Sequence, residues 1–331
     1  MENYDIVTIG GAVRDIIFYT EEGKIFKNPH DNPLVQKIIG FEAGAKIYIK
    51  DVSFLAGGGA LNTGVGFSKL GIKTGAITKV GNDQAGKDLI KKMKSRNLDT
   101  KFFQIDQRHS TAFSFIPTLK KEKAHSIFTY HGAIDYLKIP DDLNKKLKTN
   151  WFYISSLSSP KWPSILEKVF KFKSKNNIKI AWNPSSVQIK ANFKKIKPFL
   201  KDLDVIILNQ DEAKELVSKI KNITDFTIKK ILKEIYNMGP RLVVITCGKK
   251  GALCFNGEKT FTQKTKKVNV LNTTGAGDAF SSGFIASLFL KPDDFQRALV
   301  WGVLNSSAVI QLNGAQKGLL NKKEIQNIKI N

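Results

Sequence analysis

Cysteine is scarce in this sequence of 331 residues, which contains only Cys247 and Cys254. Two cysteines cannot build a disulfide framework, and their spacing is not that of a zinc site. Histidine is also rare, and the four histidines show no metal-ligand spacing; they are His30, His109, His125 and His131. These shortages exclude the disulfide-rich secreted class and predict a reduced, cytoplasmic setting.

Long apolar runs and two common nucleotide-binding signatures are missing as well. No stretch of about 18 apolar residues occurs, so we expect no transmembrane helix. Residues 1–10 lack the basic region and the cleavage-site pattern of a signal peptide, and we interpret them as a strand. Neither GxxxxGK(S/T) nor GxGxxG is present, which argues against a P-loop NTPase and against a dinucleotide-binding protein.

Arginine is rare in a chain that is otherwise strongly basic. The net charge is +24, from 53 basic and 29 acidic residues, and a charge of this size suggests nucleic-acid binding. Only five of the basic residues are arginines, however, and arginine is the usual residue for planar recognition of phosphates and bases. We therefore interpret the charge as a solvated lysine surface and expect no nucleic-acid partner. RNA binding is the alternative, and it would depend steeply on salt.

The sequence does contain apolar runs that alternate with helical patterns. Several runs have no polar alternation, which is typical of strands buried on both faces of a parallel sheet. The predicted strands cover residues 5–9, 72–78, 151–155, 178–182, 205–208, 242–246 and 252–255. The predicted helices cover residues 60–70, 84–95, 163–175, 212–220, 227–237 and 277–290. This order predicts an α/β fold in which a doubly wound, mostly parallel sheet is flanked by helices.

Two segments, residues 18–54 and 102–136, break this alternation. Both contain turn residues and short strand-like pieces, such as 46–49, which favour antiparallel strands over βα units. We expect the two insertions to pair into a small β-sheet that forms a lid beside the main sheet. Residues 1–320 are thus predicted to form a single domain, and 321–331 a loose polar tail.

The most informative local motif is Asn272-Thr273-Thr274-Gly275-Ala276-Gly277-Asp278, which opens a predicted helix. Glycines at 275 and 277 leave backbone amides open to an anion, and the first turn of a helix adds partial positive charge. A carboxylate at position 278 would repel the anion, but it makes sense as a base that takes a proton from an attacking hydroxyl. The alternative is a structural N-cap with Asp278 in the first turn.

A second glycine motif, Gly57-Gly58-Gly59-Ala60-Leu61-Asn62, also runs directly into a predicted helix. Its glycines permit close approach of a ligand, and Asn62 in the first turns could bind a hydroxyl-rich molecule; a tight loop with positive φ is the alternative. Asp15 follows the first strand, where ligands bind in open α/β sheets.

Two further motifs follow strands. Asn209 and Glu212 begin a helix and could hold hydrated Mg²⁺, although a capping box is the simpler interpretation. Thr246, Gly248 and Gly251 follow the strand 242–246 and could line phosphates, with a β-turn between two strands as the alternative.

Taken in order, these pieces resemble the ribokinase-like carbohydrate kinase family, also called the PfkB family, from residue 5 to about residue 318. The motif that ends at Asp278 is specific, and the glycine pair followed by Asn62 is moderately so. Gly314-Ala315 also falls where the family has a matching piece. The resemblance implies a ribokinase-like fold with a lid, and an ATP-dependent, Mg²⁺-requiring kinase that phosphorylates a hydroxyl of a sugar or sugar-like molecule.

The resemblance also implies a role for each motif residue. Asp278 would be the catalytic base, and the anion hole would be formed by the amides of Gly275, Ala276 and Gly277. Acceptor hydroxyls would be held by Asp15, Gly57, Gly58 and Asn62. The nucleotide would contact Asn209, Thr246, Gly248, Gly251 and Asn305, while Glu212 would act near the metal.

The sequence departs from the family where Asn272 replaces the usual aspartate, which weakens the electrostatic case for activation by potassium. Aromatic residues of the second insertion could stack on a base, and they would favour a nucleoside kinase; they are Phe113, Phe115, Phe128 and Tyr130. A sugar- or nucleotide-binding protein without turnover is a further alternative. Some family members dimerise through the lid, so a homodimer is also considered.

Overall fold

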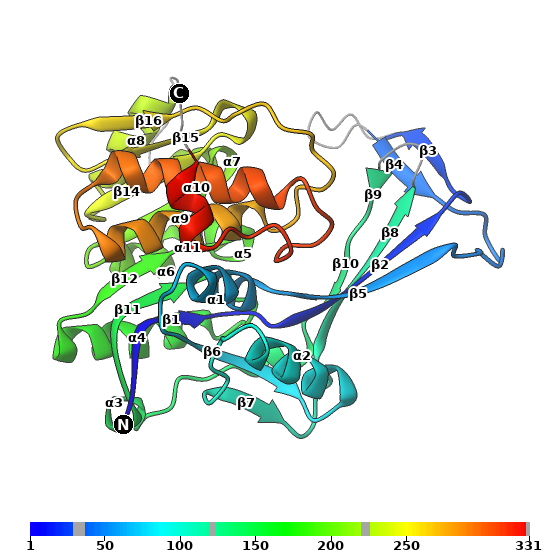
Figure 1. Cartoon of the computed structure of the whole chain (residues 1–331), viewed down its shortest axis with the longest axis horizontal. Helices are drawn as coiled ribbons and strands as arrows, with labels where there is room; N and C mark the ends of the chain where they lie inside the picture. Colours follow the sequence, from blue (N-terminus) through cyan, green and yellow to red (C-terminus); the bar gives the residue numbers. More distant parts are fainter. Residues whose placement is uncertain (29–36, 120–123, 220–225, 329–331) are drawn as a thin grey trace.

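Figure 1 shows the computed structural model of the chain, which describes residues 1–28, 37–119, 124–219 and 226–328. Within them a nine-stranded sheet has the order β16-β15-β14-β13-β12-β11-β1-β6-β7. Its strands are β1 (Glu2–Ile9), β6 (Thr74–Gly81), β7 (Phe103–Asp106), β11 (Leu147–Ile154), β12 (Lys179–Trp182), β13 (Val205–Asn209), β14 (Leu242–Thr246), β15 (Ala252–Phe255) and β16 (Thr260–Gln263). Neighbours from β7 to β14 pair in parallel, whereas β15 pairs antiparallel with both β14 and β16.

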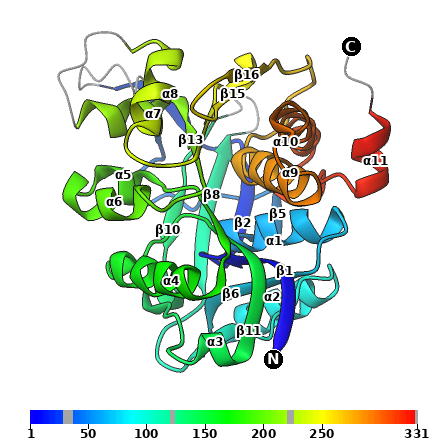
Figure 2. The ribbon, with the colours of Figure 1, turned by 90° about the vertical axis from the view of Figure 1, so that its left-hand side faces the viewer.

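Helices cover both faces of this sheet, as Figure 2 shows. One core lies between the sheet and α4 (Trp162–Asn176), α5 (Ser186–Lys190), α6 (Phe193–Leu200), α7 (Gln210–Ser218) and α8 (Ile228–Tyr236). The opposite core involves α1 (Gly59–Lys69), α2 (Gln84–Lys94), α9 (Ala276–Leu290) and α10 (Phe295–Val309). The central strand β1 buries Ile6, Val7 and Ile9 completely, which explains its unbroken apolar run. The predicted doubly wound fold is confirmed.

A second, smaller sheet projects to one side of the main sheet (Figure 1). Its order is β10-β8-β2-β5, with β9 paired to β8. The strands are β2 (Val13–Thr20), β5 (Asp51–Gly57), β8 (Ala112–Leu119), β9 (Ala124–His125) and β10 (Phe128–Tyr130). The pair β2–β8 is parallel and the other pairs are antiparallel, so the small sheet is mixed. Strands β3 (Lys24–Lys27) and β4 (Lys37–Gly40) form a separate two-stranded sheet.

The first insertion differs from its predicted bounds. Strand β2 enters the small sheet at Val13, only four residues after β1 ends, so the insertion begins before residue 18. Residues 46–49 are not in a strand, because β5 begins at Asp51. Residues 29–36 and 120–123, which belong to the two predicted insertions, lie outside the described residues.

The C-terminal part of the chain is more ordered than predicted. Residues 322–327 form α11 (Lys322–Asn327), in which Asn321 and Glu324 make a capping box and Ile325 is buried. The prediction of a loose tail is therefore wrong for these residues, and 329–331 lie outside the described part, as does Ile220, the predicted end of α7. The sequence analysis also missed α10. In the described part of the chain, no helix is long and apolar enough to span a membrane.

Candidate active site

The glycine-rich motif before α9 forms a tight turn at the N-terminus of that helix. Gly275 has φ 78°, and a Cβ there would lie 2.3 Å from the Cβ of Ala315, so this position requires glycine. Gly277 differs, because a Cβ there would meet no atom within 4 Å. The backbone at Gly277 thus faces open space, which is the geometry expected of an anion cradle.

The amides of this turn are not all available to a ligand. The Ala276 amide donates to the carbonyl of Thr273 at 3.2 Å, and the Thr274 amide donates to Asn272 Oδ1 at 2.8 Å. Among the described residues no such bond ties up the amides of Gly275 and Gly277. The prediction for Ala276 is therefore corrected, because its N–H closes the turn, and two amides remain for an anion at the helix start.

Asp278 lies in the first turn of α9 and is hydrogen-bonded to Asn62 from α1. Asn62 Nδ2 donates to Asp278 Oδ2 at 2.8 Å, across 216 residues of sequence. Burial raises the pKa of the Asp278 carboxyl, and the hydrogen bond from Asn62 opposes that rise. The residue as a whole is half-buried. A carboxyl in this state is suited to accept a proton.

Asp15 lies within β2 of the small sheet, not in the loop after β1, and it packs against Gly57. A Cβ at Gly57 would lie 2.1 Å from Asp15 Oδ2, so only glycine leaves room for this carboxylate. Gly58 has φ 93°, and a Cβ there would lie 2.4 Å from the carbonyl oxygen of Gly11. Burial and the nearby charge of Asp278 raise the pKa of Asp15 to about 6, although a hydrogen bond with Ser114 opposes the rise.

The predicted residues on the acceptor side therefore converge on one place. Strand β2 supplies Asp15, the turn between β5 and α1 supplies Gly57 and Gly58, and α1 supplies Asn62. A Cβ at Gly57 would lie 2.1 Å from Asp15 Oδ2 and a Cβ at Gly59 would lie 3.5 Å from Asp278 Oδ1, so both carboxyls lie beside this one glycine turn. Two nearby carboxyls with different surroundings can bind a hydroxyl and take its proton.

Asn209 and Glu212, on the predicted nucleotide side, form a complete capping box at the start of α7. Asn209 Oδ1 accepts from the amides of Asp211 at 3.0 Å and Glu212 at 2.8 Å, and Glu212 Oε2 accepts from the Asn209 amide at 2.9 Å. Burial raises the pKa of Glu212. No group of three metal-ligating side chains occurs among the described residues. The capping-box interpretation is thus the one that the structure shows, and the second oxygen of Glu212, Oε1, takes no part in the cap.

The segment from Thr246 to Gly251 connects two antiparallel strands, as the β-turn interpretation had it. Thr246 pairs with Ala252, and Thr246 Oγ1 donates to the Leu208 carbonyl at 3.5 Å. Gly251 has φ 99°, and a Cβ there would lie 1.9 Å from the Gln263 carbonyl oxygen, so this glycine is needed by the fold. Gly248 has φ 53° with nothing within 4 Å of a Cβ, and it therefore keeps open space beside it.

Asn305 was expected beside the nucleotide base, and the structure corrects this expectation. The residue is 0% exposed. Its Nδ2 donates to the carbonyl of Ala279 at 2.8 Å and to Ser282 Oγ at 3.1 Å, and its Oδ1 accepts from the Leu320 amide at 2.9 Å. Asn305 therefore joins α10 to α9 and to the segment before α11, and it has no face open to a ligand.

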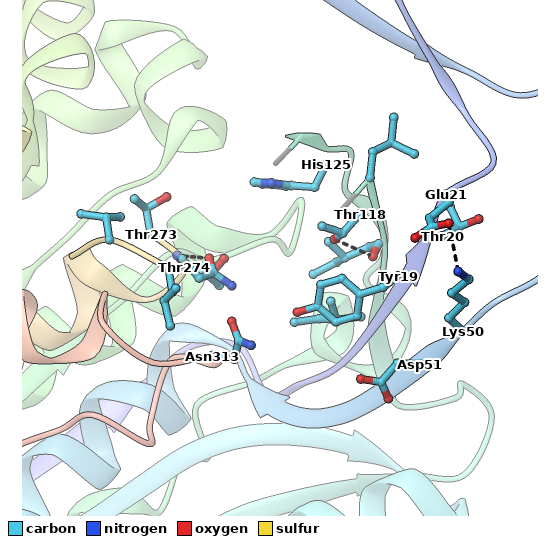
Figure 3. Close-up of a pocket in the computed structure, with 16 residues that line it drawn as sticks. Tyr19, Thr20, Glu21, Lys50, Asp51, Thr118, His125, Thr273, Thr274 and Asn313 are labelled. Carbon is cyan, nitrogen blue, oxygen red and sulfur yellow. Dashed lines mark hydrogen bonds and ion pairs between the residues drawn. The ribbon is translucent and has the colours of Figure 1, made fainter. Parts of the chain in front are cut away.

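A cavity of about 550 Å³ lies between the small sheet and residues 270–274. Figure 3 shows Tyr19, Thr118 and His125 on the sheet side, across from Thr273, Thr274 and Asn313. We call the side of the sheet that lines this cavity the inner face. It also carries Asp15, because residues 15, 17 and 19 of β2 point the same way.

The aromatic residues that could have stacked on a base lie on the opposite side of the small sheet. Phe113 and Phe115 alternate with Ser114 and Ile116 along β8, and Phe128 and Tyr130 pair with them from β10. We call this side the outer face; its exposed apolar residues are Val52, Phe54, Phe113, Phe115, Phe128 and Tyr130. The predicted stacking role of the aromatics is wrong, because their rings point away from the cavity.

One side chain near the base was missed by the sequence analysis. Gln316 Nε2 donates to Asn62 Oδ1 at 2.8 Å, on the far side of Asn62 from Asp278. Gln316 follows Gly314-Ala315, a pair that the sequence analysis did note, but nothing in that pair marks the glutamine itself. Its partner, however, lies 254 residues away in the chain.

Comparisons with known proteins bear on the family and the fold. A family model described as pfkB family carbohydrate kinase matches residues 5–322. The chain is 26% identical over 290 residues to a ribokinase of Staphylococcus aureus, covering 87% of this chain and 92% of the relative. It is 30% identical over 268 residues to an ATP-dependent 6-phosphofructokinase of Thermoanaerobacterium thermosaccharolyticum, covering 78% and 80%. The structure of Arabidopsis thaliana ribokinase complexed with ribose and ATP superposes with a TM-score of 0.80 at 20% identity, covering 98% of both chains. This last likeness confirms the predicted ribokinase-like fold.

Proposed function

The chain belongs to the pfkB family of carbohydrate kinases, enzymes that transfer a phosphoryl group to an alcohol, and we propose that its acceptor is a hydroxyl of a sugar or sugar-like small molecule. The observation that carries the proposal is the convergence of Asp278, Asn62 and Asp15 beside the amides at the start of α9. This arrangement offers a base, hydroxyl-binding groups and an anion cradle within one site.

In the proposed mechanism, Asp15 holds the acceptor so that one hydroxyl faces Asp278, and Asn62 holds the Asp278 carboxylate through its own N–H. Asp278 accepts the proton of that hydroxyl while the oxygen of the hydroxyl attacks the γ-phosphorus. The bond from the γ-phosphorus to the bridging oxygen breaks, and ADP leaves. The amides of Gly275 and Gly277 donate to the oxygens of the phosphoryl group in transfer, where negative charge develops. Gly57 supports this arrangement because its missing Cβ leaves room for Asp15.

We propose ATP with Mg²⁺ as the phosphoryl donor, held along the loops that follow β13 and β14. Gly248 leaves an open cradle, and Glu212 keeps Oε1 without a hydrogen-bond partner among the described residues. A magnesium ion near Glu212 would neutralise phosphate charge, and it would keep most of its waters. Thr246 and Gly251 would shape this side, whereas Asn209 would act through the cap that positions Glu212.

The nucleoside-kinase alternative has lost its main support. It rested on aromatic rings that could stack on a base, and those rings lie on the outer face. The inner face carries Ile17, Tyr19, Ile116 and Thr118, a mixture of apolar and hydroxyl groups. Such a surface suits the face of a polyol at least as well as a base. Nucleosides therefore enter the test as a competing class of acceptor.

The proposal is tested by measuring ATP-dependent ADP release across sugars, sugar acids, sugar phosphates and nucleosides, with Asp278→Asn as the control. We expect one sugar-like class to give turnover that the variant abolishes. Turnover with nucleosides alone would show that the acceptor is a nucleoside and not a sugar. Equal ADP release by both proteins with every acceptor, while ATP still binds, would contradict the kinase assignment.

We also propose that the outer face pairs with the outer face of a second copy. Phe128 is 61% exposed and Phe54 is 52% exposed, and together with their neighbours they form a contiguous apolar surface on one sheet. A twofold contact would cover this surface on both copies at once. Phe54→Glu and Phe128→Glu should each give a monomer by light scattering, whereas Tyr48→Glu, which changes an exposed ring outside these strands, should not. A monomeric unmodified chain at micromolar concentration would contradict the dimer.

A further inference from the structure

We propose that Gln316 and Arg96 are positioning residues that fix the orientation of the Asn62 amide, so that Asn62 always presents an N–H to the catalytic carboxylate of Asp278. The inference rests on the proposed kinase function for the identity of the base. It starts from a continuous chain of hydrogen bonds that joins four side chains far apart in the sequence: Arg96, Gln316, Asn62 and Asp278.

The chemistry of the two ends sets the direction of this chain. An arginine guanidinium has only donors, and an ionised carboxylate has only acceptors. Arg96 Nη1 donates to Gln316 Oε1, Gln316 Nε2 donates to Asn62 Oδ1, and Asn62 Nδ2 donates to Asp278 Oδ2. If either amide were turned over, two donors or two acceptors would face each other. Only one orientation of each amide therefore satisfies every contact.

The middle of the chain is shielded from water, which makes the orientation costly to change. Gln316 is 4% exposed and Asn62 is 5% exposed, so neither amide can replace a lost partner with solvent. The second N–H of Gln316 points to the carbonyl of Ala56 at 3.2 Å, another group that can only accept. The carbonyl of Ala56 and the guanidinium of Arg96 thus hold Gln316 from both sides.

The fixed amide also selects which oxygen of Asp278 receives the proton. Oδ2 is occupied by the N–H of Asn62, whereas Oδ1 has no hydrogen-bond partner among the described residues. A Cβ at Gly59 would lie 3.5 Å from Oδ1, which is ordinary van der Waals contact, so this oxygen lies beside the glycine turn. The chain of amides therefore keeps Oδ1 free for the acceptor hydroxyl.

Charged and titratable neighbours surround both ends. At the Asp278 end, Asp15 from β2 and the buried Tyr153 from β11 interact electrostatically with the carboxyl. At the other end, the charge of Arg96 acts on Lys69 from α1 and Lys92 from α2, and Lys317 also acts on Lys92.

The test compares Gln316→Glu with Gln316→Met. A glutamate beside Arg96 stays ionised and cannot donate, so the Asn62 amide turns over and faces Asp278 with its oxygen. We expect kcat at pH 6.5 to fall about 10-fold, the scale of one hydrogen bond to a charged group, and the acid limb of the kcat profile to move to higher pH. Gln316→Met removes the partner without reversing it, so its effect should have the same sign and be smaller.

Arg96→Lys retains a donor-only group, so the acid limb of its kcat profile should stay near its normal position. Arg96→Met has no donor, so its acid limb should shift part of the way to higher pH. Gln311→Glu is the matched control, because Gln311 donates to the Ser307 carbonyl and belongs to no chain that reaches Asn62. Its acid limb should stay in place. Carboxyl-carbon NMR titration of Asp278 without any acceptor separates this proposal from the kinase assignment, because it needs no turnover. A titration midpoint unchanged in both Gln316 variants would overturn the positioning role.

Discussion

The acceptor side and the nucleotide side of the site use similar residues for different purposes. On the acceptor side, Asn62 and Asp278 are joined across two helices, and Asp15 rests where Gly57 lacks a side chain. On the nucleotide side, Asn209 caps the helix that it begins, and the side-chain amide of Asn305 forms hydrogen bonds only within the fold. An asparagine at a helix start is thus a cap in one place and a partner of the base in the other.

The two asparagines at helix starts differ in the sequence separation of their hydrogen bonds. The capping bonds of Asn209 span two or three residues, and local geometry alone explains them. The Asn62 bond spans 216 residues and helps keep a buried acid in place. Local structure alone does not explain a polar contact that is assembled from distant elements.

The largest effect should come from removing the base. Asp278→Asn keeps the size of the side chain and a carbonyl that accepts from Asn62, but it cannot take a proton at neutral pH. We expect kcat to fall by about 10²-fold or more, with acceptor binding retained. Single-turnover kinetics and acceptor titration measure the two quantities separately. Near-normal turnover would remove Asp278 from the mechanism.

The next effect concerns the anion cradle. Gly277→Val adds a branched side chain whose Cβ lies in the open space at the helix start. We expect kcat/KM for ATP to fall about 10- to 100-fold, because the branched side chain occupies the place of the phosphoryl group. The melting temperature should change little. Gly275→Val is the contrasting variant, since its Cβ would meet Ala315 and should lower stability as well.

Asp15 should link function and stability through pH. Its pKa is raised to about 6 from the ordinary aspartate value of 3.8, so the folded state binds more protons than the unfolded state between these pH values. Stability is therefore fully present below about pH 4 and declines as pH rises towards 6. Asp15→Asn should remove this loss and raise the free energy of unfolding at pH 7.5 by about 1–3 kcal/mol. The variant should also weaken acceptor binding. A stabilisation at pH 4 as large as that at pH 7.5 would show that the pKa of Asp15 is not its cause.

The nucleotide side can be tested by separating the cap from the charge. Glu212→Gln keeps a carbonyl oxygen for the Asn209 amide, so the free energy of unfolding should be unchanged. The Mg²⁺ concentration needed for half-maximal activity should rise about 2- to 10-fold. Asn209→Ala removes the cap and should cost about 1 kcal/mol of stability. A Mg²⁺ requirement that does not move in Glu212→Gln would leave this pair with a purely structural role.

The smallest effect should follow a change of monovalent cation. Asn272 supplies an amide where the family usually has a carboxylate, and its Oδ1 is already used by the Thr274 amide. We expect the rate to differ by less than about twofold between K⁺ and Na⁺ at equal ionic strength, because a neutral oxygen attracts a cation weakly. A strong stimulation by K⁺ would show that other oxygens hold the ion.

Much of the fold followed from patterns that are local in the sequence. Strands β14 and β15 were predicted with the bounds that they have, since unbroken apolar runs can only be buried in the middle of a layered sheet. Helix α10 was missed because it is apolar on nearly every side and carries small polar residues, so it lacks the one-sided stripe that marks a surface helix. The beginning of β2 was hidden by the charged pair Arg14-Asp15.

The site was predictable where residues act near their own loops and unpredictable where they act across the fold. Asp278 and Gly277 belong to one turn, and Asn62 lies at the start of a helix after glycines, so their places in the fold could be predicted from local sequence. Gln316 reaches Asn62 only after the chain has folded, and no local pattern distinguishes it from a surface glutamine. The sequence likewise could not tell that Asn305 would face inwards.

The position of Asp15 on the small sheet has a consequence for how such an enzyme diversifies. The inner face, where we propose that the acceptor binds, is built from β2, β5 and β8, whereas the proposed base and anion cradle belong to α9, well over a hundred residues further along the chain. Substitutions that accumulate in the first segment can change which alcohol is selected while the phosphoryl-transfer apparatus is inherited intact. Exchanging the small sheet between relatives should therefore transplant substrate preference as a module.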